Sequence, residues 1–287
     1  MRITLDSVAC GFLLMQAEWE RHPVRGQSLE AMMARSETLR VPEPIAGFWP
    51  GALGQARVDP GFRAYIDRKY HKIILVADLL AAVGAESAEA VAAACEDFAA
   101  GGARQWLKVA GAAKAELVDA RLQSRPAIGH GVVAEYGSFV GYSCTRMAWR
   151  SGGEARVLSL ESDAVHVLVA RHVVARARRS AEVELLPGMA HDTTARLPED
   201  WGGDAVAFAF MDHRGTRFHE ELAQLERLRA LAPAARFLAD NALKPGAPEL
   251  LWHFEHCRAR HAATSWSLPE FISESCEDWM SASDYHP

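Results

Sequence analysis

The chain has 287 residues, which suits one large domain with or without an appendage. Lys and Arg total 31 and Asp and Glu total 37, so the net charge of -6 argues against nucleic acid or an anionic membrane as the main partner. The sequence has no apolar run of membrane length and no clean signal-peptide pattern, so we expect a cytoplasmic protein. Its five cysteines include no CxxC pair, so we expect neither a disulfide framework nor a zinc site.

Residues 1–103 are predicted to form an N-terminal helical extension. A Pro/Gly-rich interval at 41–61 precedes two helical patterns, 71–84 and 87–100, and Ser87 is placed to cap the second. No chemical motif occurs in this region. We expect these helices to pack as a cap or as an interface through which the protein forms a homo-oligomer.

Residues 104–287 show a different pattern, in which short apolar runs alternate with helical stretches. The predicted strands are 131–136, 155–161, 183–188, 205–212 and 235–241. The helical stretches between them are 142–150, 163–178 and 219–231. Near-continuously apolar strands that alternate with helices predict an α/β domain with a mostly parallel, doubly wound, Rossmann-like sheet. In such sheets the ligand binds beyond the carboxyl ends of the strands.

The first two strand ends carry residues typical of a nucleoside site. The first strand runs into EYGSFVGYS (135–143), where Gly137 and Gly141 permit a tight turn and a close approach to backbone N–H groups. The spacing is not GxGxxG, and the loop alone could be an ordinary turn. Glu161 ends the second strand, where an acid either binds ribose or complements a helix dipole. The two features together favour a nucleoside ligand.

Oxygen-bearing side chains end the next pair of strands. Asp212 ends the fourth strand, and Asp240 and Asn241 end the fifth. Two carboxylates and an amide carbonyl suit Mg²⁺ or another hard divalent ion. Asp212 could instead cap a helix, and Asp240-Asn241 could belong to a turn. Because acids on neighbouring strand ends repel each other, the pair favours the ion.

Several segments resemble the catechol O-methyltransferase family. They are GVVAEYGSFVGYSCTRMAW (131–149), FMDHRGTRF (210–218), FLADNALKPGAPELL (237–251) and SLPEF (267–271). The resemblance covers residues 104–285 with a few gaps. It implies a seven-stranded methyltransferase fold with a final antiparallel strand, bound S-adenosylmethionine, bound Mg²⁺ and a small-molecule acceptor.

The resemblance also implies roles for individual residues. The methionine end of the cofactor would be lined by Glu135, Gly137, Phe139, Gly141, Tyr142 and Ser143. Glu161 would bind the ribose, Ala190 and His191 would lie by the adenine, and Asp212 would border the cofactor as well as the ion. The metal ligands would be Asp212, Asp240 and Asn241, and Glu270 would accept a hydrogen bond from the acceptor.

The chain departs from the family where the general base stands. Family members carry DHWKDRY, whose lysine is the base, whereas this chain has DHRGTRF with Gly215 at the lysine position. A coordinated ion lowers the pKa of a hydroxyl, so loss of the lysine slows catalysis without forbidding it. His213 could act as the base or only support the metal loop, whereas His219 is expected on a solvated helix face. Arg214 could recognise an acidic group, together with Asn241 and Glu270 on the acceptor side.

Three functions remain open from the sequence. The first is a Mg²⁺-dependent O-methyltransferase acting on a catechol or another vicinal diol. The second is a methyltransferase of the same fold with a different acceptor, and the third is a cofactor-binding protein with little catalysis. The retained Asp212, Asp240 and Asn241 favour the first two, and Gly215 favours the second or third. If the acceptor is a catechol, a lysine restored at position 215 is expected to raise turnover.

Overall fold

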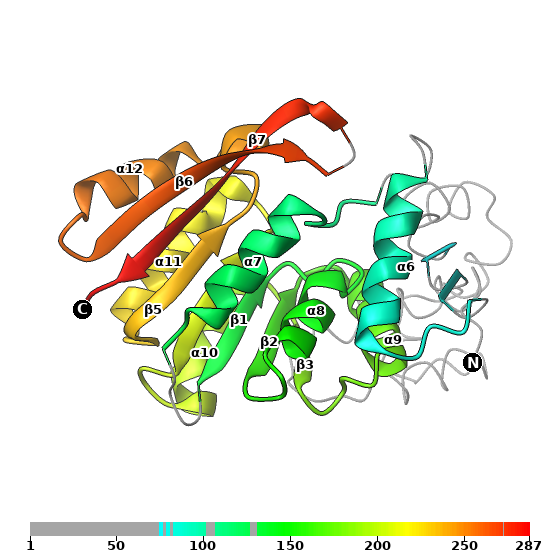
Figure 1. Ribbon diagram of the computed structural model, residues 1–287. Helices are drawn as coiled ribbons and strands as arrows, with labels where there is room; N and C mark the ends of the chain where they lie inside the picture. The colour runs from blue at the N-terminus through cyan, green and yellow to red at the C-terminus, as the bar shows by residue number, and fades with distance from the viewer. Residues whose placement is uncertain (1–74, 77–78, 81–82, 102–106, 127–130, 272) are drawn as a thin grey trace, which may run out of the picture.

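The computed structural model describes residues 75–76, 79–80, 83–101, 107–126, 131–271 and 273–287 (Figure 1). The Pro/Gly-rich interval, most of the helical pattern 71–84 and the proposed domain boundary at residues 103 and 104 lie outside the described residues. Within those described ranges, no helix combines the length and the apolar character needed to cross a membrane.

The described chain is built on a seven-stranded sheet of order β3-β2-β1-β4-β5-β7-β6. Its strands are β1 Val132–Tyr136, β2 Arg156–Glu161, β3 Val183–Pro187, β4 Val206–Met211, β5 Leu231–Ala239, β6 His261–Glu270 and β7 Ser273–Tyr285. The first five are parallel, and β7 is antiparallel to both β5 and β6. This confirms the predicted fold, with one addition, because the C-terminal region forms a two-stranded hairpin at the sheet edge.

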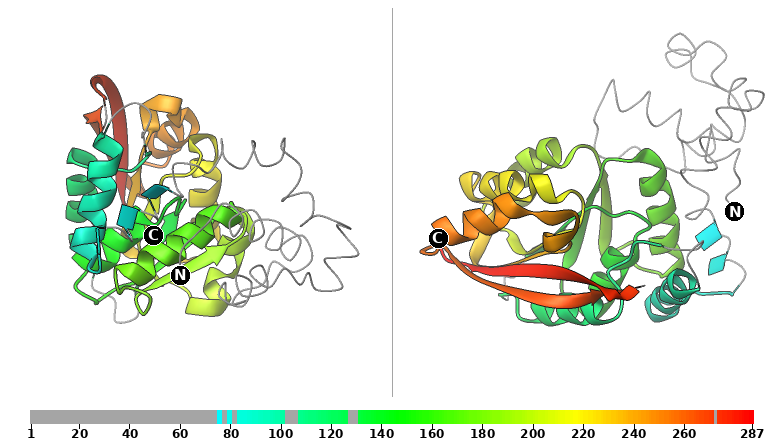
Figure 2. Two further views of the ribbon diagram at one scale, coloured as in Figure 1. Left: turned by 90° about the vertical axis from the view of Figure 1, so that its right-hand side faces the viewer. Right: turned by 90° about the horizontal axis from the view of Figure 1, so that it is seen from above.

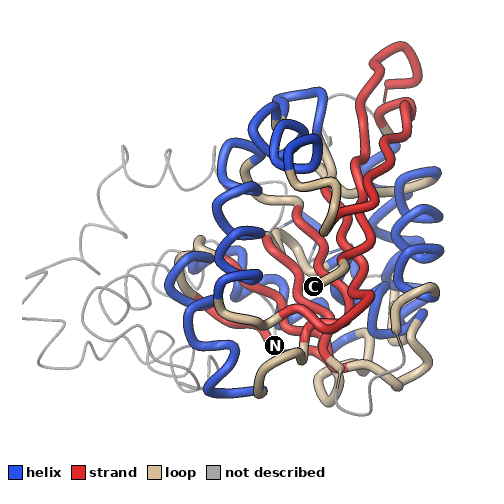
Figure 3. The backbone as a smooth tube through the Cα atoms, turned by 90° about the vertical axis from the view of Figure 1, so that its left-hand side faces the viewer, coloured by secondary structure: helices blue, strands red, loops and turns tan. Residues whose placement is uncertain are grey.

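Helices cover both faces of the sheet (Figures 2 and 3). They are α6 Ala88–Ala100, α7 Ala113–Gln123, α8 Tyr142–Arg150, α9 Ala164–Arg176, α10 Ala190–Trp201, α11 Phe218–Arg227 and α12 Pro248–His256. One apolar core contains side chains of α6 to α9, and a second contains side chains of α10 to α12. Every residue of β1 and β4 is buried, and apart from Glu135 of β1 the two strands are continuous apolar runs in the sequence.

The predicted helices α6, α8, α9 and α11 are present. Ser87 caps α6 as expected, with its hydroxyl accepting the N–H of Ala90 at 3.2 Å. The sequence patterns did not predict α7, α10 or α12. α10 contains Pro198, a residue that argues against a helix when only the sequence pattern is considered.

The predicted boundary between α11 and β5 is wrong. The helical pattern at 219–231 extends into the strand, because β5 begins at Leu231 and not at residue 235. α11 ends at Arg227, and Arg229 takes a left-handed backbone conformation with φ 52°. β5 then contains an irregularity around exposed Pro233 and Ala234, where the pairing with β4 shifts register. The proline and the bulge interrupt the apolar strand pattern, so the first residues of β5 could not be recognised as a strand from the sequence.

Candidate active site

The loop after β1 is held tightly against β4 and α9. Gly137 and Gly141 have φ of 99° and 82°. A Cβ on Gly137 would lie 2.9 Å from the carbonyl oxygen of Asp212 and 3.0 Å from Cβ of His213. A Cβ on Gly141 would lie 2.9 Å from Cα of Ala170. Both glycines are therefore needed for backbone conformation and for space, and the loop opens α8 at Gly141 without a side-chain cap.

Glu161 connects this loop to the end of β2. One carboxylate oxygen accepts the N–H of Phe139 at 2.9 Å, and the other accepts the N–H of Asp163 at 2.7 Å. The Phe139 ring meets the His166 ring edge-on, with centroids 5.0 Å apart. Glu161 thus has a structural function that the sequence did not indicate, and ribose binding by its carboxylate stays a prediction.

Glu135 lies inside the fold and not on its surface. Its side chain is fully buried, the hydroxyl of Ser159 donates to its Oε2, and Ser138 contacts the same serine hydroxyl at 2.5 Å. Burial raises the pKa of Glu135 to about 7. Its Oε1 atom has no hydrogen-bond partner within the described part of the chain. A buried acceptor without a donor, directly before the glycine loop, fits a ligand that brings a donor.

Four other predicted cofactor residues lie at the starts of α8 and α10. The phenol of Tyr142 donates to Glu96 of α6, so its side chain faces that helix, and Ser143 is half-buried in the next position. Ala190 and His191 open α10, and the carbonyl of His191 accepts a hydrogen bond from Gln224 at 2.9 Å. Each residue stands beyond a carboxyl end of a parallel strand, where the ligand was predicted.

Asp212 and Asp240 directly follow the adjacent strands β4 and β5. Backbone bonds from Asp212 to Tyr136 and from Asp240 to Met211, both 2.9 Å, fix these ends side by side. Burial raises the pKa of Asp212 well above its usual range, and the nearby charge of Asp240 raises it further. Burial also raises the pKa of Asp240, to about 6, although Lys114 opposes the shift. Two such acids need positive charge nearby to remain ionised.

Lys114 of α7 supplies part of that charge. Its buried ammonium lies 2.8 Å from Oδ1 of Asp240, 2.9 Å from Oε2 of Glu270 and 2.9 Å from Oδ2 of Asp278. Burial alone would lower the pKa of Lys114, but these carboxylates raise it above the usual lysine value. Lys114 is therefore a permanent cation and not a base.

Asp278 of β7 joins the hairpin to the segment after β5. Its carboxylate accepts Nδ2 of Asn241 at 2.7 Å and the backbone N–H of Lys244 at 2.9 Å. Asn241 has a left-handed backbone, with φ 58° and ψ 33°. Because the amide nitrogen of Asn241 faces Asp278, its carbonyl Oδ1 faces away from that carboxylate. Sequence analysis assigned no role to either Lys114 or Asp278.

Glu270 was predicted on the acceptor side, and it reaches this cluster from the end of β6. Its bond to Lys114 places it beside Asp240, and its side chain keeps 23% of its surface exposed. The predicted acceptor residue and a predicted metal ligand therefore share one buried cation.

His213 pairs with a buried carboxylate. Its Nε2 lies 2.6 Å from Oε2 of Glu221 on α11, and its ring packs beside the rings of Tyr136 and Phe218 at 5.7 and 5.2 Å between centroids. Glu221 was not predicted. His219 is half-buried, with Nδ1 lacking a partner among the described residues, so its expected placement on a solvated face is wrong.

Gly215 occupies a position without room for a side chain. It begins the short turn η1 Gly215–Arg217, and a Cβ there would lie 2.3 Å from the carbonyl oxygen of Gly246 in η2 Ala242–Gly246. A lysine at 215 would therefore require η2 to move, and the expectation that it raises turnover stays a prediction. Arg214 is exposed before this turn, and its side chain makes no ion pair with a described residue.

The residues present fit both a hard divalent ion and a nucleoside cofactor. Asp212, Asp240 and Asn241 offer oxygen atoms at one edge of the sheet, and the charge of Asp240 raises the pKa of Asp212, as an acid without enough positive charge nearby would do. The glycine loop lies at the neighbouring strand end, where an added Cβ would fill the available space.

No protein-family model matches the sequence. Catechol O-methyltransferase from Sus scrofa is 32% identical over 148 residues, which are 51% of this chain and 77% of that protein. The mouse enzyme is 29% identical over 149 residues, 52% of this chain, so the chain spans only 55% of that relative's length.

Solved structures agree on the fold. An O-methyltransferase of tomaymycin synthesis from Streptomyces achromogenes, in complex with SAM, has a TM-score of 0.55 and 19% identity over 68% of this chain and 89% of that one. An O-methyltransferase from Bacillus cereus, in complex with SAH, has a TM-score of 0.52 and 20% identity over 71% and 90%. Sequence identity to the pig enzyme, together with this sheet order, shows that the chain belongs to the catechol O-methyltransferase family of S-adenosylmethionine-dependent O-methyltransferases.

Proposed function

We propose that this O-methyltransferase depends on Mg²⁺ and acts on a small acceptor with two adjacent hydroxyl groups, such as a catechol. The observation that carries the proposal is the pairing of Asp212 with Asp240, beside Asn241, at the strand ends next to the glycine loop. A cofactor-binding protein without catalysis would have no need of two acids side by side at this position.

The cofactor would lie along the loop from Gly137 to Ser143. Glu161 would direct its carboxylate to the ribose, with Ala190 and His191 beside the adenine. The buried Oε1 of Glu135 would accept a donor from the methionine end. When bound, S-adenosylmethionine supplies a methyl group on a positively charged sulfur, which an acceptor oxygen attacks.

The ion would be held by Asp212, by Oδ2 of Asp240 and by Oδ1 of Asn241. The ammonium of Lys114 binds Oδ1 of Asp240, and the amide nitrogen of Asn241 donates to Asp278, so these contacts orient the two ligands. When bound, Mg²⁺ lowers the pKa of a coordinated acceptor hydroxyl. Glu270, held by Lys114, would accept a hydrogen bond from the second hydroxyl.

The proton would pass to His213. With Nε2–H donating to Glu221, Nδ1 carries the lone pair that accepts a proton. A buried carboxylate that orients a histidine in this way also stabilises the imidazolium that forms. This histidine would replace the lysine that the space at Gly215 excludes.

A second acceptor class is favoured by Arg214. Its exposed guanidinium stands two residues after Asp212 and could bind a carboxylate on the acceptor. If the acceptor is acidic, wild type should methylate a dihydroxybenzoate faster than unsubstituted catechol. In Arg214→Gln the rate with dihydroxybenzoate should fall to the rate with catechol.

We also keep two proposals for the whole chain. Residues 1–103 would form a helical extension of the methyltransferase domain at 104–287, with α6 packed on that domain and the part before it mediating homo-oligomer formation. The protein would act in the cytoplasm. Sedimentation of the full chain against a chain that begins at residue 83 tests the first of these proposals.

The central experiment measures methyl transfer to catechol from labelled S-adenosylmethionine while Mg²⁺ is titrated into chelator-treated protein. Asp240→Asn should lose the dependence on the ion and most of the activity. Asp97→Asn, at an exposed site on α6, is the matched control and should behave as wild type. Full activity of wild type in excess chelator would refute the ion dependence, and absence of transfer to any diol at saturating Mg²⁺ would refute the acceptor class.

A further inference from the structure

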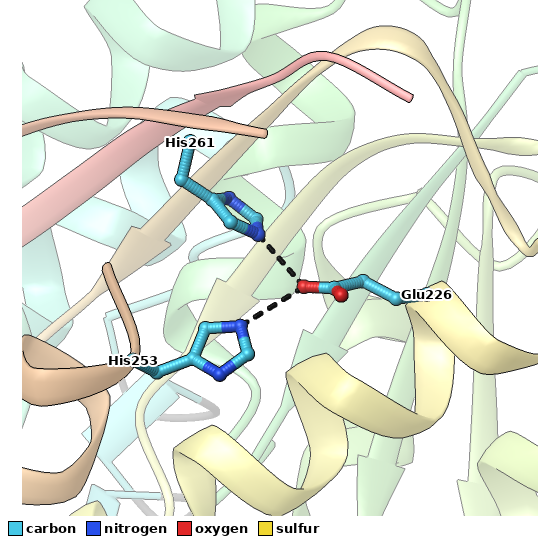
Figure 4. Close-up of side chains that lie close together, drawn as sticks. All are labelled: Glu226, His253 and His261. Carbon is cyan, nitrogen blue, oxygen red and sulfur yellow. Dashed lines mark hydrogen bonds and ion pairs between the residues drawn. The ribbon is translucent and has the colours of Figure 1, made fainter. Parts of the chain in front are cut away.

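A second cluster of metal-ligating side chains lies outside the candidate active site. It consists of Glu226 near the end of α11, His253 on α12 and His261 at the first position of β6, and we call it the α11–α12–β6 cluster (Figure 4). Nε2 of His253 lies 3.0 Å and Nε2 of His261 lies 2.7 Å from the same carboxylate oxygen, Oε1 of Glu226. Figure 4 shows the two imidazoles converging on this oxygen from separate elements.

The cluster is shielded from water and its members are held in place. The side chains of Glu226, His253 and His261 keep 6%, 15% and 0% of their surface exposed. The other ring nitrogen of His261, Nδ1, contacts the hydroxyl of Ser283 at 3.0 Å. A serine hydroxyl can donate or accept, so it can hold either tautomer of His261. Metal-bound histidines commonly have such a partner on their second nitrogen.

We propose that the α11–α12–β6 cluster binds a divalent transition-metal ion of the Zn²⁺ type. Two imidazoles and one carboxylate are ligands that such ions prefer over Mg²⁺. In a tetrahedral zinc site with bonds of about 2.0–2.1 Å, neighbouring ligand atoms lie about 3.3 Å apart. The two histidine–carboxylate separations, 3.0 and 2.7 Å, would need to increase by about 0.3 and 0.6 Å to reach that value. The ligand atoms of all three residues already lie within 4.8 Å of one another.

Arg260 forms an ion pair with Glu226, so a metal ion would compete with its guanidinium for this carboxylate. Its Nη1 lies 2.6 Å from Oε2 of Glu226, the oxygen that does not face the histidines. The Arg260 side chain is 46% exposed, so it can move into water. Burial opposes ionisation of Glu226, but the two histidine hydrogen bonds outweigh it and lower its pKa to about 2. The carboxylate is therefore ionised and able to bind a cation at neutral pH.

The position of the cluster defines what the ion would do. His261 begins β6, whereas Glu270 ends it, so the ion would lie at the opposite end of the hairpin from the candidate active site. It would join α11 and α12 to the hairpin whose other end carries Glu270 and Asp278. We infer a stabilising role, because an ion that binds only the folded chain adds its binding energy to folding.

The test uses chelator-treated full-length protein with Asp240→Asn, which weakens the Mg²⁺ site so that it does not obscure the result. Zn²⁺ is titrated by calorimetry, and the melting temperature is recorded with and without Zn²⁺. We expect His253→Gln to weaken one equivalent of Zn²⁺ at least tenfold and to remove the Zn²⁺-dependent rise in melting temperature. His256→Gln, on an exposed residue of the same helix, is the control and should change neither.

Two further measurements do not depend on the folding of the His253 variant. Co²⁺ added to the unsubstituted cluster should give the visible absorption of a tetrahedral nitrogen–oxygen site. Arg260→Gln should increase the Zn²⁺ affinity several-fold, since it removes a nearby positive charge. Zn²⁺ binding that is the same in the His253 and His256 variants would overturn the proposal, as would a lower melting temperature of Arg260→Gln with no change in Zn²⁺ affinity. That last result would identify a hydrogen-bonded cluster that needs no ion.

Discussion

Replacement of Lys114 by methionine is the most informative single perturbation of the acid cluster. The ammonium is 1% exposed and lies within 2.9 Å of carboxylates from the end of β5, the end of β6 and β7. Loss of one partner from a buried ion pair costs about 3–5 kcal/mol, because the remaining charge stays buried without compensation. At about 2–4 °C per kcal/mol for a domain of this size, we expect Lys114→Met to lower the melting temperature by about 10 °C.

The source of this loss can be isolated by a double-mutant cycle with Asp278→Asn, measured by urea unfolding in chelator. Residues in contact through one ion pair couple by about 0.5–3 kcal/mol, so the double variant should be less destabilised than the sum of the single variants. Added Mg²⁺ should restore part of the stability of Lys114→Met, because the ion replaces a missing positive charge. A single variant within 1 kcal/mol of wild type, or additive effects in the cycle, would refute the role of Lys114 as counter-ion.

Three further predictions address the neighbouring residues. The folded-state pKa of Glu135 is raised from 4.5 to about 7, so its ionisation lowers the free energy of unfolding as pH rises from 4.5 to 7. At about 1.4 kcal/mol per pH unit, Glu135→Gln should gain about 3 kcal/mol of stability relative to wild type across that range, measured by urea unfolding. Parallel pH profiles of the two proteins would contradict this. Gly215→Lys should lower both stability and methyl transfer at every pH, because its Cβ would overlap the Gly246 carbonyl at 2.3 Å; activity above wild type would show that η2 moves aside. Glu161→Ala should weaken S-adenosylhomocysteine binding about tenfold, equivalent to one charge-assisted hydrogen bond of about 1.5 kcal/mol. A lower melting temperature with unchanged calorimetric affinity would leave Glu161 a structural role through Phe139, Asp163 and His166.

The five parallel strands and their carboxyl ends could be predicted because the information for them is local in the sequence. The apolar runs of β1 and β4 are buried on both faces, so their sequences alone identify them as central strands. Glu161, Asp212 and Asp240 follow such runs directly, and parallel strands bring their carboxyl ends to one edge. The N-cap Ser87 was also readable, since a capping side chain acts three residues away.

The partners of these residues could not be read from the sequence, because they are long-range. Lys114 meets Glu270 and Asp278 across 156 and 164 residues. Nothing near Lys114 in AGAAKAEL marks it as buried, and a lysine on a short helix is ordinarily a surface residue. Glu221 looks like one more polar residue of an amphipathic helix, although it is buried against His213. Its role depends on how α11 packs beside the end of β4.

Gly215 shows how the structure can change the meaning of a substitution. In the sequence, Gly215 stands where the family has its lysine base, which leaves open whether catalysis is slower or the acceptor is different. In the structure the backbone of η1 meets the backbone of η2, the segment that follows the proposed ligand Asn241. A side chain at 215 would push on that segment, so glycine here is part of how the proposed ion site is held. Under the proposed function the proton acceptor would then lie elsewhere at this edge, and the pair formed by His213 and Glu221 is our candidate.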